Sequence, residues 1–283
     1  MRVRYSFSSR HTRTIDNHNK HRNAFSKVVR EMVDKCDIIL EVLDARFIDE
    51  TRNAELERLV AQKSKKIIYV VNKVDLVNYR MLKKQLAEKD LFPYALVSCP
   101  ERRGGRELRD RIKMEASKIK DFDKINVGIV GYPNTGKSSI INLLVGRHIA
   151  KTASEAGFTK GIQKLKLSEN IFILDTPGVI ESKEYSMDNS KKISEHAKLG
   201  ARTWDKVKEP ESVVHELMKE YPGMLEKYYS LAVDGDSEKL IEELGRKNHF
   251  LLSGNKVDVD RAARLILREW QEGKIFKDAS KGE

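Results

Sequence analysis

The sequence predicts an α/β domain built around a mostly parallel sheet, followed by a small all-helical domain. Three observations support this prediction. Short apolar runs alternate with helix-like segments over residues 31–182, as expected when parallel strands are joined by helices. Several of these runs end abruptly at a glycine or at a polar motif. Over residues 183–283 the apolar side chains recur mainly at helical spacing, which indicates a separate helical domain.

The first 30 residues precede the predicted sheet and form a basic arm that leads into a helix. Residues 1–35 hold nine Lys and Arg but only three Asp and Glu. The whole chain of 283 residues has a formal net charge of +11. This excess favours a polyanionic partner, either nucleic acid or an acidic membrane surface, and we expect the arm to contact nucleic acid. An ordinary solvated surface is the alternative interpretation of the charge.

The composition also limits where the protein is expected to act. No apolar run approaches the roughly 18 residues that a membrane-spanning helix needs, and no signal-peptide core follows Met1. The two cysteines, Cys36 and Cys99, form neither a metal-ligand pattern nor a disulfide framework. We therefore expect a cytoplasmic protein without a transmembrane segment, acting as a monomer.

The strongest motif is a glycine-rich loop between a strand and a helix. An apolar run over residues 125–130 breaks at Gly131, and residues 131–138, GYPNTGKS, fit the pattern G-x-x-x-x-G-K-[ST]. Such a loop wraps its backbone N–H groups around phosphate, and the following helix adds its positive N-terminal end. Lys137 is expected to reach the β- and γ-phosphates and to act in catalysis, and Ser138 to bind Mg²⁺. The expected nucleotide contacts of the loop are Asn134, Thr135, Gly136, Lys137, Ser138 and Ser139.

A second phosphate motif, DTPG, ends the apolar run at residues 171–174. Asp175 is placed to hold Mg²⁺ through a water, and the Gly178 N–H to meet the γ-phosphate. Thr159, in GFTKG between the two motifs, is the candidate switch residue that closes on Mg²⁺ and the γ-phosphate. The alternative for Thr159 is a simple turn threonine. Thr159 and Gly178 join Lys137 as the expected catalytic residues.

The guanine-reading pattern N-K-x-D occurs twice, as NKVD at residues 72–75 and again at 255–258. The second copy follows a short apolar run broken by Ser253 and Gly254, and it precedes an amphipathic helix for which Asp258 or Asp260 looks like an N-cap. The first copy follows a fully apolar run at residues 67–71. We therefore assign base reading to the first copy.

The first copy has specific expected roles. The Asp75 carboxylate accepts two hydrogen bonds from guanine, a donor pair that adenine lacks. Asn72 faces the O6/N7 edge of the base, and the Lys73 stem lies along its plane. A third apolar run ends at Ser98 and Cys99, where a backbone N–H would meet the guanine O6.

The motifs are therefore those of a Ras-like P-loop GTPase in rotated order, with the base reader encoded before the phosphate loop. A predicted helix over residues 105–124 rejoins the two halves. This arrangement predicts a circularly permuted GTPase domain over residues 31–182 that binds GTP or GDP with Mg²⁺. Because residues 175–180 lead directly into the helical domain, we expect the nucleotide state to set that domain's orientation.

The rotated motif order, with DAR at residues 44–46, GYPNTGKSS, GFTKG and DTPG, resembles the YlqF/YawG family of circularly permuted GTPases. The resemblance covers nearly the whole chain, including the helical tail. It implies GTP-driven assembly of the large ribosomal subunit, with rRNA as the bound surface. Cys99 stands where alanine is commoner, and Phe158 and Lys160 flank the switch threonine. The alternatives are a GTP-stabilised RNA or protein scaffold and a membrane-surface GTPase.

Hydrolysis is expected to be slow without a partner or an ion. Ras-like enzymes orient the attacking water with a glutamine, and here that position is Val179, which cannot do so. Asn134 is the candidate ligand for a K⁺ ion, as in related GTPases with apolar residues at the glutamine position. The alternative is that Asn134 only caps its loop.

Overall fold

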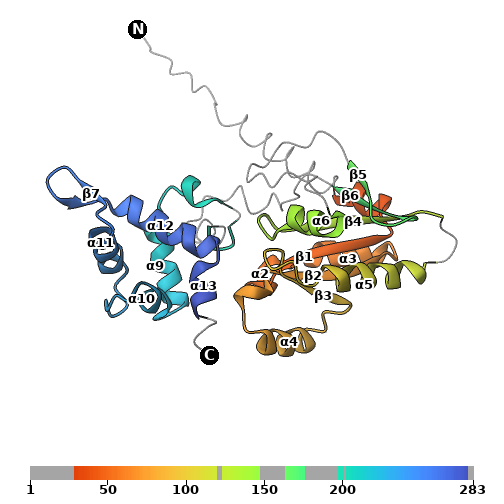
Figure 1. Ribbon diagram of the computed structural model, residues 1–283, viewed down its shortest axis with the longest axis horizontal. Coiled ribbons are helices and arrows are strands. Elements are labelled where there is room, and N and C mark those ends of the chain that lie inside the picture. The colour runs from red at the N-terminus through yellow and green to blue at the C-terminus, as the bar shows by residue number, and fades with distance from the viewer. Residues whose placement is uncertain (1–28, 120–122, 147–162, 176–196, 201, 280–283) are drawn as a thin grey trace, which may run out of the picture.

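The computed structural model describes residues 29–119, 123–146, 163–175, 197–200 and 202–279. Figure 1 shows a part built on a sheet and, beside it, a part built of helices. Contacts between residues far apart in the sequence join the two parts, among them a hydrogen bond from Arg46 to the carbonyl of Trp270. The two expected regions are therefore packed against each other.

A six-stranded sheet forms the first part, with strand order β3-β2-β1-β4-β6-β5. All neighbouring strands are parallel except β5, which runs antiparallel to β6 at one edge. The strands are β1 (Ile38–Asp44), β2 (Lys66–Asn72), β3 (Tyr94–Val97), β4 (Ile125–Gly131), β5 (Gln163–Lys166) and β6 (Ile171–Asp175). The predicted mostly parallel sheet is confirmed.

Strand order in the sheet differs from chain order, because β1 lies between β2 and β4. β1 pairs on one side with β2 and on the other with β4, so that Ile38 faces both Lys66 and Val127. The strand that leads into the glycine loop therefore lies beside the first strand of the sheet. Parallel strands place their carboxyl ends at one edge, and the loops after β1, β2, β3 and β4 all emerge there.

Helices cover both faces of this sheet. Alternate residues along β1 and β2 point to opposite faces, and both sets are buried in separate apolar clusters. α5 (Gly105–Ser117) and α6 (Lys137–Val145) pack on one face, and α3 (Ala54–Gln62) and α4 (Tyr79–Glu88) on the other. The short helices α2 (Ile48–Thr51) and η1 (Val74–Leu76) follow β1 and β2. The helix expected over residues 105–124 ends at Ser117.

The second part is a helical bundle with its own core. It comprises η2 (Trp204–Lys206), α9 (Pro210–Glu220), α10 (Met224–Tyr229), α11 (Ser237–Lys247), α12 (Val259–Gln271) and α13 (Lys274–Ala279). A short hairpin, β7 (Leu251–Leu252) with β8 (Lys256–Val257), joins α11 to α12. The hairpin is an addition to the predicted all-helical domain. None of the helices in the described ranges is long and apolar enough to cross a membrane.

Phe47 and Leu76, from the sheet part, belong to the same buried cluster as the helical bundle. Both follow strands at the carboxyl edge of the sheet, Phe47 after β1 and Leu76 after β2. The helical bundle therefore packs against the edge of the sheet at which the glycine loop also lies.

Candidate functional site

The first NKVD copy and the glycine loop meet in space. The side-chain amide of Asn72 donates a hydrogen bond of 2.7 Å to the carbonyl of Thr135, 63 residues away, and both residues are buried. Gly136 lies so close to this amide that a Cβ atom would clash with the Asn72 nitrogen, and its φ of +98° also favours glycine. The sequence encodes these two loops far apart, and the sheet brings them into contact.

The turn after β2 places Asp75 beside the loop that follows β3. Lys73 adopts a left-handed conformation, with φ of +64°, and Asp75 follows in η1. Burial raises the pKa of the Cys99 thiol to about 11, and the negative charge of Asp75 adds to the effect. Ser98 is fully buried and forms a backbone bridge with Arg103. Asp75, Ser98 and Cys99 therefore lie at one end of the candidate site.

One oxygen of the Asp75 carboxylate is buried and has no hydrogen-bond partner among the described residues. A buried carboxylate oxygen without a donor is costly, and native structures seldom leave such a group unpaired. The ring N–H and the exocyclic amine of guanine are donors of the kind this oxygen needs. The geometry at Asp75 therefore fits a guanine base.

Lys137 donates hydrogen bonds to two backbone carbonyls of the glycine loop. The Lys137 ammonium donates to the carbonyls of Gly131 (2.9 Å) and Tyr132 (2.7 Å), and the Thr135 hydroxyl also donates to Tyr132 (2.9 Å). Ser138 and Ser139 lie in the first turn of α6, half-buried. The loop thus places a cation, hydroxyls and a helix N-terminus together, which is the chemistry of a phosphate site.

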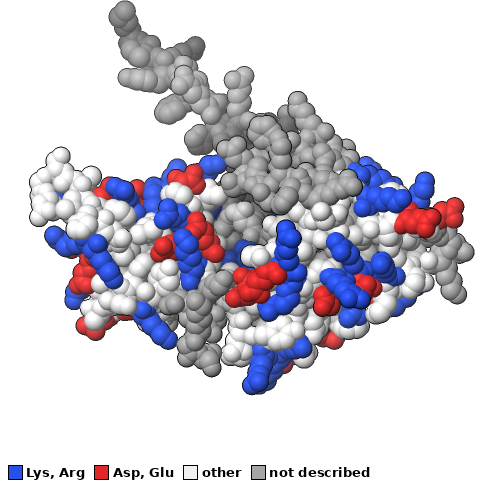
Figure 2. All heavy atoms as spheres, viewed as in Figure 1, with Lys and Arg blue, Asp and Glu red and all other residues white. Residues whose placement is uncertain are grey.

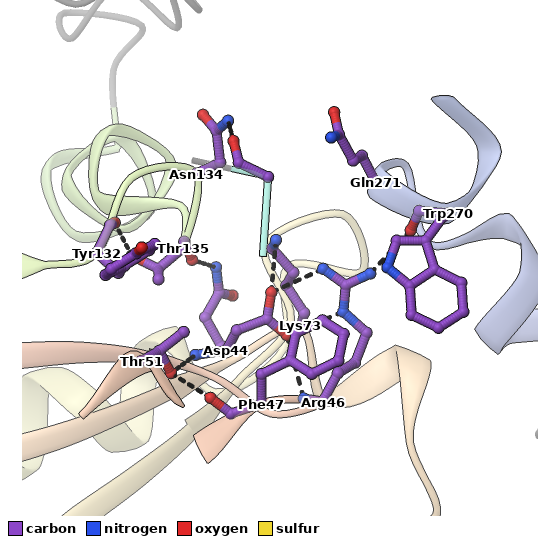
Figure 3. Close-up of polar contacts among 12 residues, drawn as sticks. Asp44, Arg46, Phe47, Thr51, Lys73, Tyr132, Asn134, Thr135, Trp270 and Gln271 are labelled. Carbon is purple, nitrogen blue, oxygen red and sulfur yellow. Dashed lines mark hydrogen bonds and ion pairs between the residues drawn. The ribbon is translucent and has the colours of Figure 1, made fainter. Parts of the chain in front are cut away.

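Lys73, the lysine of the first NKVD copy, belongs to an ion-pair network that no motif in the sequence reveals. Lys73 pairs with Asp44 at 2.8 Å, and Arg46 pairs with the same Asp44 oxygen at 2.7 Å (Figure 3). Burial opposes the charged form of Asp44, but hydrogen bonds and charges from Arg46 and Lys73 outweigh it and lower the pKa of Asp44 to about 2. The signal available in the sequence was the position of Asp44, at the end of the strand that neighbours the NKVD strand.

Not every predicted site residue has a described side chain. Asp175 ends β6, so its backbone lies at the expected edge of the sheet. Thr159 and Gly178, and with them Val179, lie outside the described residues. In the described ranges no three His, Cys, Asp or Glu side chains are grouped to hold a metal ion. That is compatible with Mg²⁺, which is commonly held by few protein groups together with phosphates. The nucleotide and metal roles of all these residues stay predictions.

Asn134 makes an unexpected contact with the helical part. Its side-chain amide donates to the carbonyl of Gly200, and its backbone is left-handed, with φ of +59°. The amide oxygen is the atom that would bind a cation, so the K⁺ role stays a prediction alongside this contact.

The second NKVD copy lies in the β7–β8 hairpin and the start of α12. Asn255 is in the hairpin turn with φ of +60°, and Asp258 is the N-cap of α12, accepting a hydrogen bond of 3.0 Å from the Arg261 N–H. The predicted N-cap is confirmed. Asn255 and Asp258 therefore have structural roles, in a turn and as a helix cap, that do not require a bound guanine base.

Comparison with known proteins finds similarity to GTP-binding proteins. The family model described as a 50S ribosome-binding GTPase matches residues 126–233. A GTP-binding protein of Methanocaldococcus jannaschii is 39% identical over 257 residues, covering 88% of this chain and 65% of that protein. Ribosome biogenesis GTPase A of Priestia megaterium is 29% identical, with 90% of this chain and 93% of that protein covered.

A longer plant relative and a solved structure complete the comparison. The guanine nucleotide-binding protein-like NSN1 of Arabidopsis thaliana is 32% identical, and this chain spans only 47% of its length. The crystal structure of GNP-bound YlqF from T. maritima superposes with a TM-score of 0.62 at 23% sequence identity, covering 88% of this chain and 94% of that one. This likeness shows the fold, which has the same permuted order of elements.

Proposed function

Because the chain belongs to the circularly permuted GTPases that include YlqF, we propose that it binds GTP and GDP between Asp75 and Lys137. We further propose that it hydrolyses GTP to GDP and phosphate during assembly of the large ribosomal subunit. The contact between Asn72 and Thr135 carries the first proposal, since it joins the base-reading loop to the phosphate loop.

Selectivity for guanine follows from the Asp75 carboxylate, one oxygen of which is buried. A charge-assisted hydrogen bond is worth about 1.5–3 kcal/mol, and guanine offers two donors to this group. Adenine would leave the buried Asp75 oxygen unpaired. A site built to accept a hydrogen bond strongly rejects a base that lacks the matching donor. The base-reading end of the site therefore favours guanine over adenine on physical grounds.

The phosphate end of the site is supported by the geometry of Lys137. Its ammonium donates to the Gly131 and Tyr132 carbonyls inside the glycine loop, and this supports its proposed role toward the β- and γ-phosphates. Ser138, Thr159 and, through a water, Asp175 would hold Mg²⁺, which neutralises charge on the phosphates. Thr159 and the Gly178 N–H would meet the γ-phosphate.

We expect slow GTP hydrolysis that K⁺ accelerates, because Val179 cannot orient water and Asn134 offers an amide oxygen at the edge of the phosphate loop. The measurement is phosphate release by the full chain in K⁺ and in Na⁺ at equal ionic strength. Asn134→Ala should remove the difference between the two salts. Equal rates in K⁺ and Na⁺ would contradict the ion's role, and no release in either salt would contradict hydrolysis itself.

Action on the ribosome is supported by the matched family model, by the relatives' names and by the charge of +11. In the view of Figure 2, Lys and Arg lie over both parts of the molecule with Asp and Glu among them. We assign part of the rRNA contact to the basic arm, because residues 1–35 hold nine Lys and Arg against three Asp and Glu.

The ribosomal role is tested by cosedimentation with purified ribosomal subunits. We expect the protein to sediment with large subunits when a non-hydrolysable GTP analogue is bound, and less with GDP. Small subunits serve as the matched control for non-specific binding to RNA, and raising the salt should weaken binding because phosphate contacts are ionic. Equal sedimentation with both subunits in every nucleotide state would contradict the proposal.

A further inference from the structure

The loop after β1 carries a cation and an aromatic ring into the core of the helical part. Phe47 stacks on Trp270 with ring centroids 6.3 Å apart and meets Phe276 edge-on at 5.7 Å. The guanidinium of Arg46 lies 5.0 Å from the centroids of both the Phe47 and Phe276 rings. Arg46 is therefore packed between the sheet part and the helical part.

Arg46 also donates hydrogen bonds to both the sheet part and the helical part. Its Nε and Nη2 donate to the two oxygens of Asp44, while its Nη1 donates to the Trp270 carbonyl at 3.0 Å, near the end of α12 (Figure 3). The Arg46 side chain is only 1% exposed. Since Asp44 also pairs with Lys73, a continuous set of polar contacts runs from the base-reading loop to α12.

The phosphate loop reaches the same end of α12 by a second route. Asn134 donates to the carbonyl of Gly200. Two hydrogen bonds join residues 197–200 to α12. The Trp270 indole donates to the Lys198 carbonyl at 3.1 Å, and the Gln271 amide donates to the Ala197 carbonyl at 2.7 Å. The last turn of α12 is thus linked to the base-reading loop through Arg46 and Asp44, and to the phosphate loop through residues 197–200.

We propose that Arg46 is a positioning residue that holds Lys73 through Asp44 and links nucleotide binding to docking of the helical part. The inference rests on the proposed guanine nucleotide site. Any ligand that orders Lys73 and the phosphate loop favours the docked position of α12, and by reciprocity docking favours the ligand. The named contacts join Lys73 and the phosphate loop to α12, and GDP would occupy both ends of the proposed site, so we expect GDP to engage this link.

The chemistry of Arg46 explains why lysine cannot replace it. The planar guanidinium spans a carboxylate and a carbonyl in fixed directions, whereas a lysine ammonium is a single point charge on a flexible stem. Arg46→Lys keeps the positive charge beside Asp44 and loses the bridge to Trp270. The substitution therefore tests the hydrogen bond to Trp270 separately from the positive charge beside Asp44.

Arg264 offers a matched control inside the helical part. It binds both oxygens of Asp260 and donates to the Trp204 carbonyl at 2.9 Å, the same pattern as Arg46, and its described hydrogen bonds are all to residues of the helical part. The probe is release of a fluorescent GDP from the full-length protein. We expect release about tenfold faster from Arg46→Lys, the effect of one lost charge-assisted contact, and unchanged release from Arg264→Lys.

Hydrogen exchange of the amides at residues 268–273 gives a readout that a loss of general stability would not reproduce. GDP should slow this exchange in the unaltered protein and in Arg264→Lys, and have no effect on it in Arg46→Lys. Phe276→Leu removes the ring that Arg46, Phe47 and Trp270 share and leaves the Arg46 hydrogen bonds in place, so it should speed GDP release less than Arg46→Lys.

The outcomes separate the inference from the function on which it rests. Equal GDP release from Arg46→Lys and Arg264→Lys, or GDP protection of α12 that persists in Arg46→Lys, would overturn the link while leaving the nucleotide site intact. Failure of the unaltered protein to retain fluorescent GDP would instead overturn the proposed nucleotide site.

Discussion

Replacing Asp75 by asparagine is expected to move the preference of the protein from guanosine to xanthosine nucleotides. The carboxylate accepts from two guanine donors, whereas an asparagine amide presents a donor that matches the 2-oxo group of xanthine. Loss of the charge-assisted pair should weaken GDP binding about 100-fold. Competition of GDP and xanthosine diphosphate against a fluorescent nucleotide measures the change.

The identical tetrapeptide at residues 255–258 provides the control. Asp258→Asn makes the same substitution in the same sequence, but Asp258 caps α12. Because asparagine is itself a good N-cap, we expect little change in stability and none in nucleotide preference. If the two variants exchanged these behaviours, the base reader would lie in the helical part and the rotated order would be wrong.

Replacing Trp270 by alanine should cost about 3–5 kcal/mol of unfolding free energy, the usual range for a buried Trp→Ala change. Trp270 is fully buried, its ring packs against Phe47, Tyr221 and Phe276, and its indole N–H is bonded to the Lys198 carbonyl. A loss of this size is a large part of the 5–15 kcal/mol by which domains are typically stable. Urea unfolding of the two proteins measures it.

Trp204→Ala is the control for this prediction. Trp204 is only partly buried, and it packs at the edge of the same core, with the guanidinium of Arg268 5.8 Å from its ring. It therefore leaves a smaller void, and we expect a loss well below that of Trp270→Ala. Similar losses in both variants would contradict the assignment of the larger loss to the full burial of Trp270.

The sheet could be predicted from the sequence because its strands carry their own signals. The apolar runs that became β1, β2, β4 and β6 are buried on both faces, so they read as continuous hydrophobic stretches. β5 was missed because it is a short edge strand with two exposed lysines, a composition that protects an edge and resembles a loop. The β7–β8 hairpin was missed because its two-residue strands are too short to show a period.

The meeting of the NKVD and glycine loops could also be predicted, because each motif follows a strand and parallel strands end at one edge. The ion-pair network of Asp44 and Arg46 could not be predicted from the sequence. The DAR motif is visible in the sequence, but the Trp270 carbonyl that Arg46 binds lies 224 residues away. The contact of Asn134 with Gly200 is likewise tertiary. Patterns within one element do not specify which distant residue completes a buried ion pair.

The central claim is that one pocket is assembled from a base-reading loop and a phosphate loop encoded in reversed order. A crystal structure of the full chain with GDP and Mg²⁺ tests it most directly. The account predicts the Asp75 carboxylate within hydrogen-bond distance of the guanine N–H groups and the Lys137 ammonium against the β-phosphate of the same GDP. A guanine base bound at Asp258, or phosphates bound away from Lys137, would contradict it.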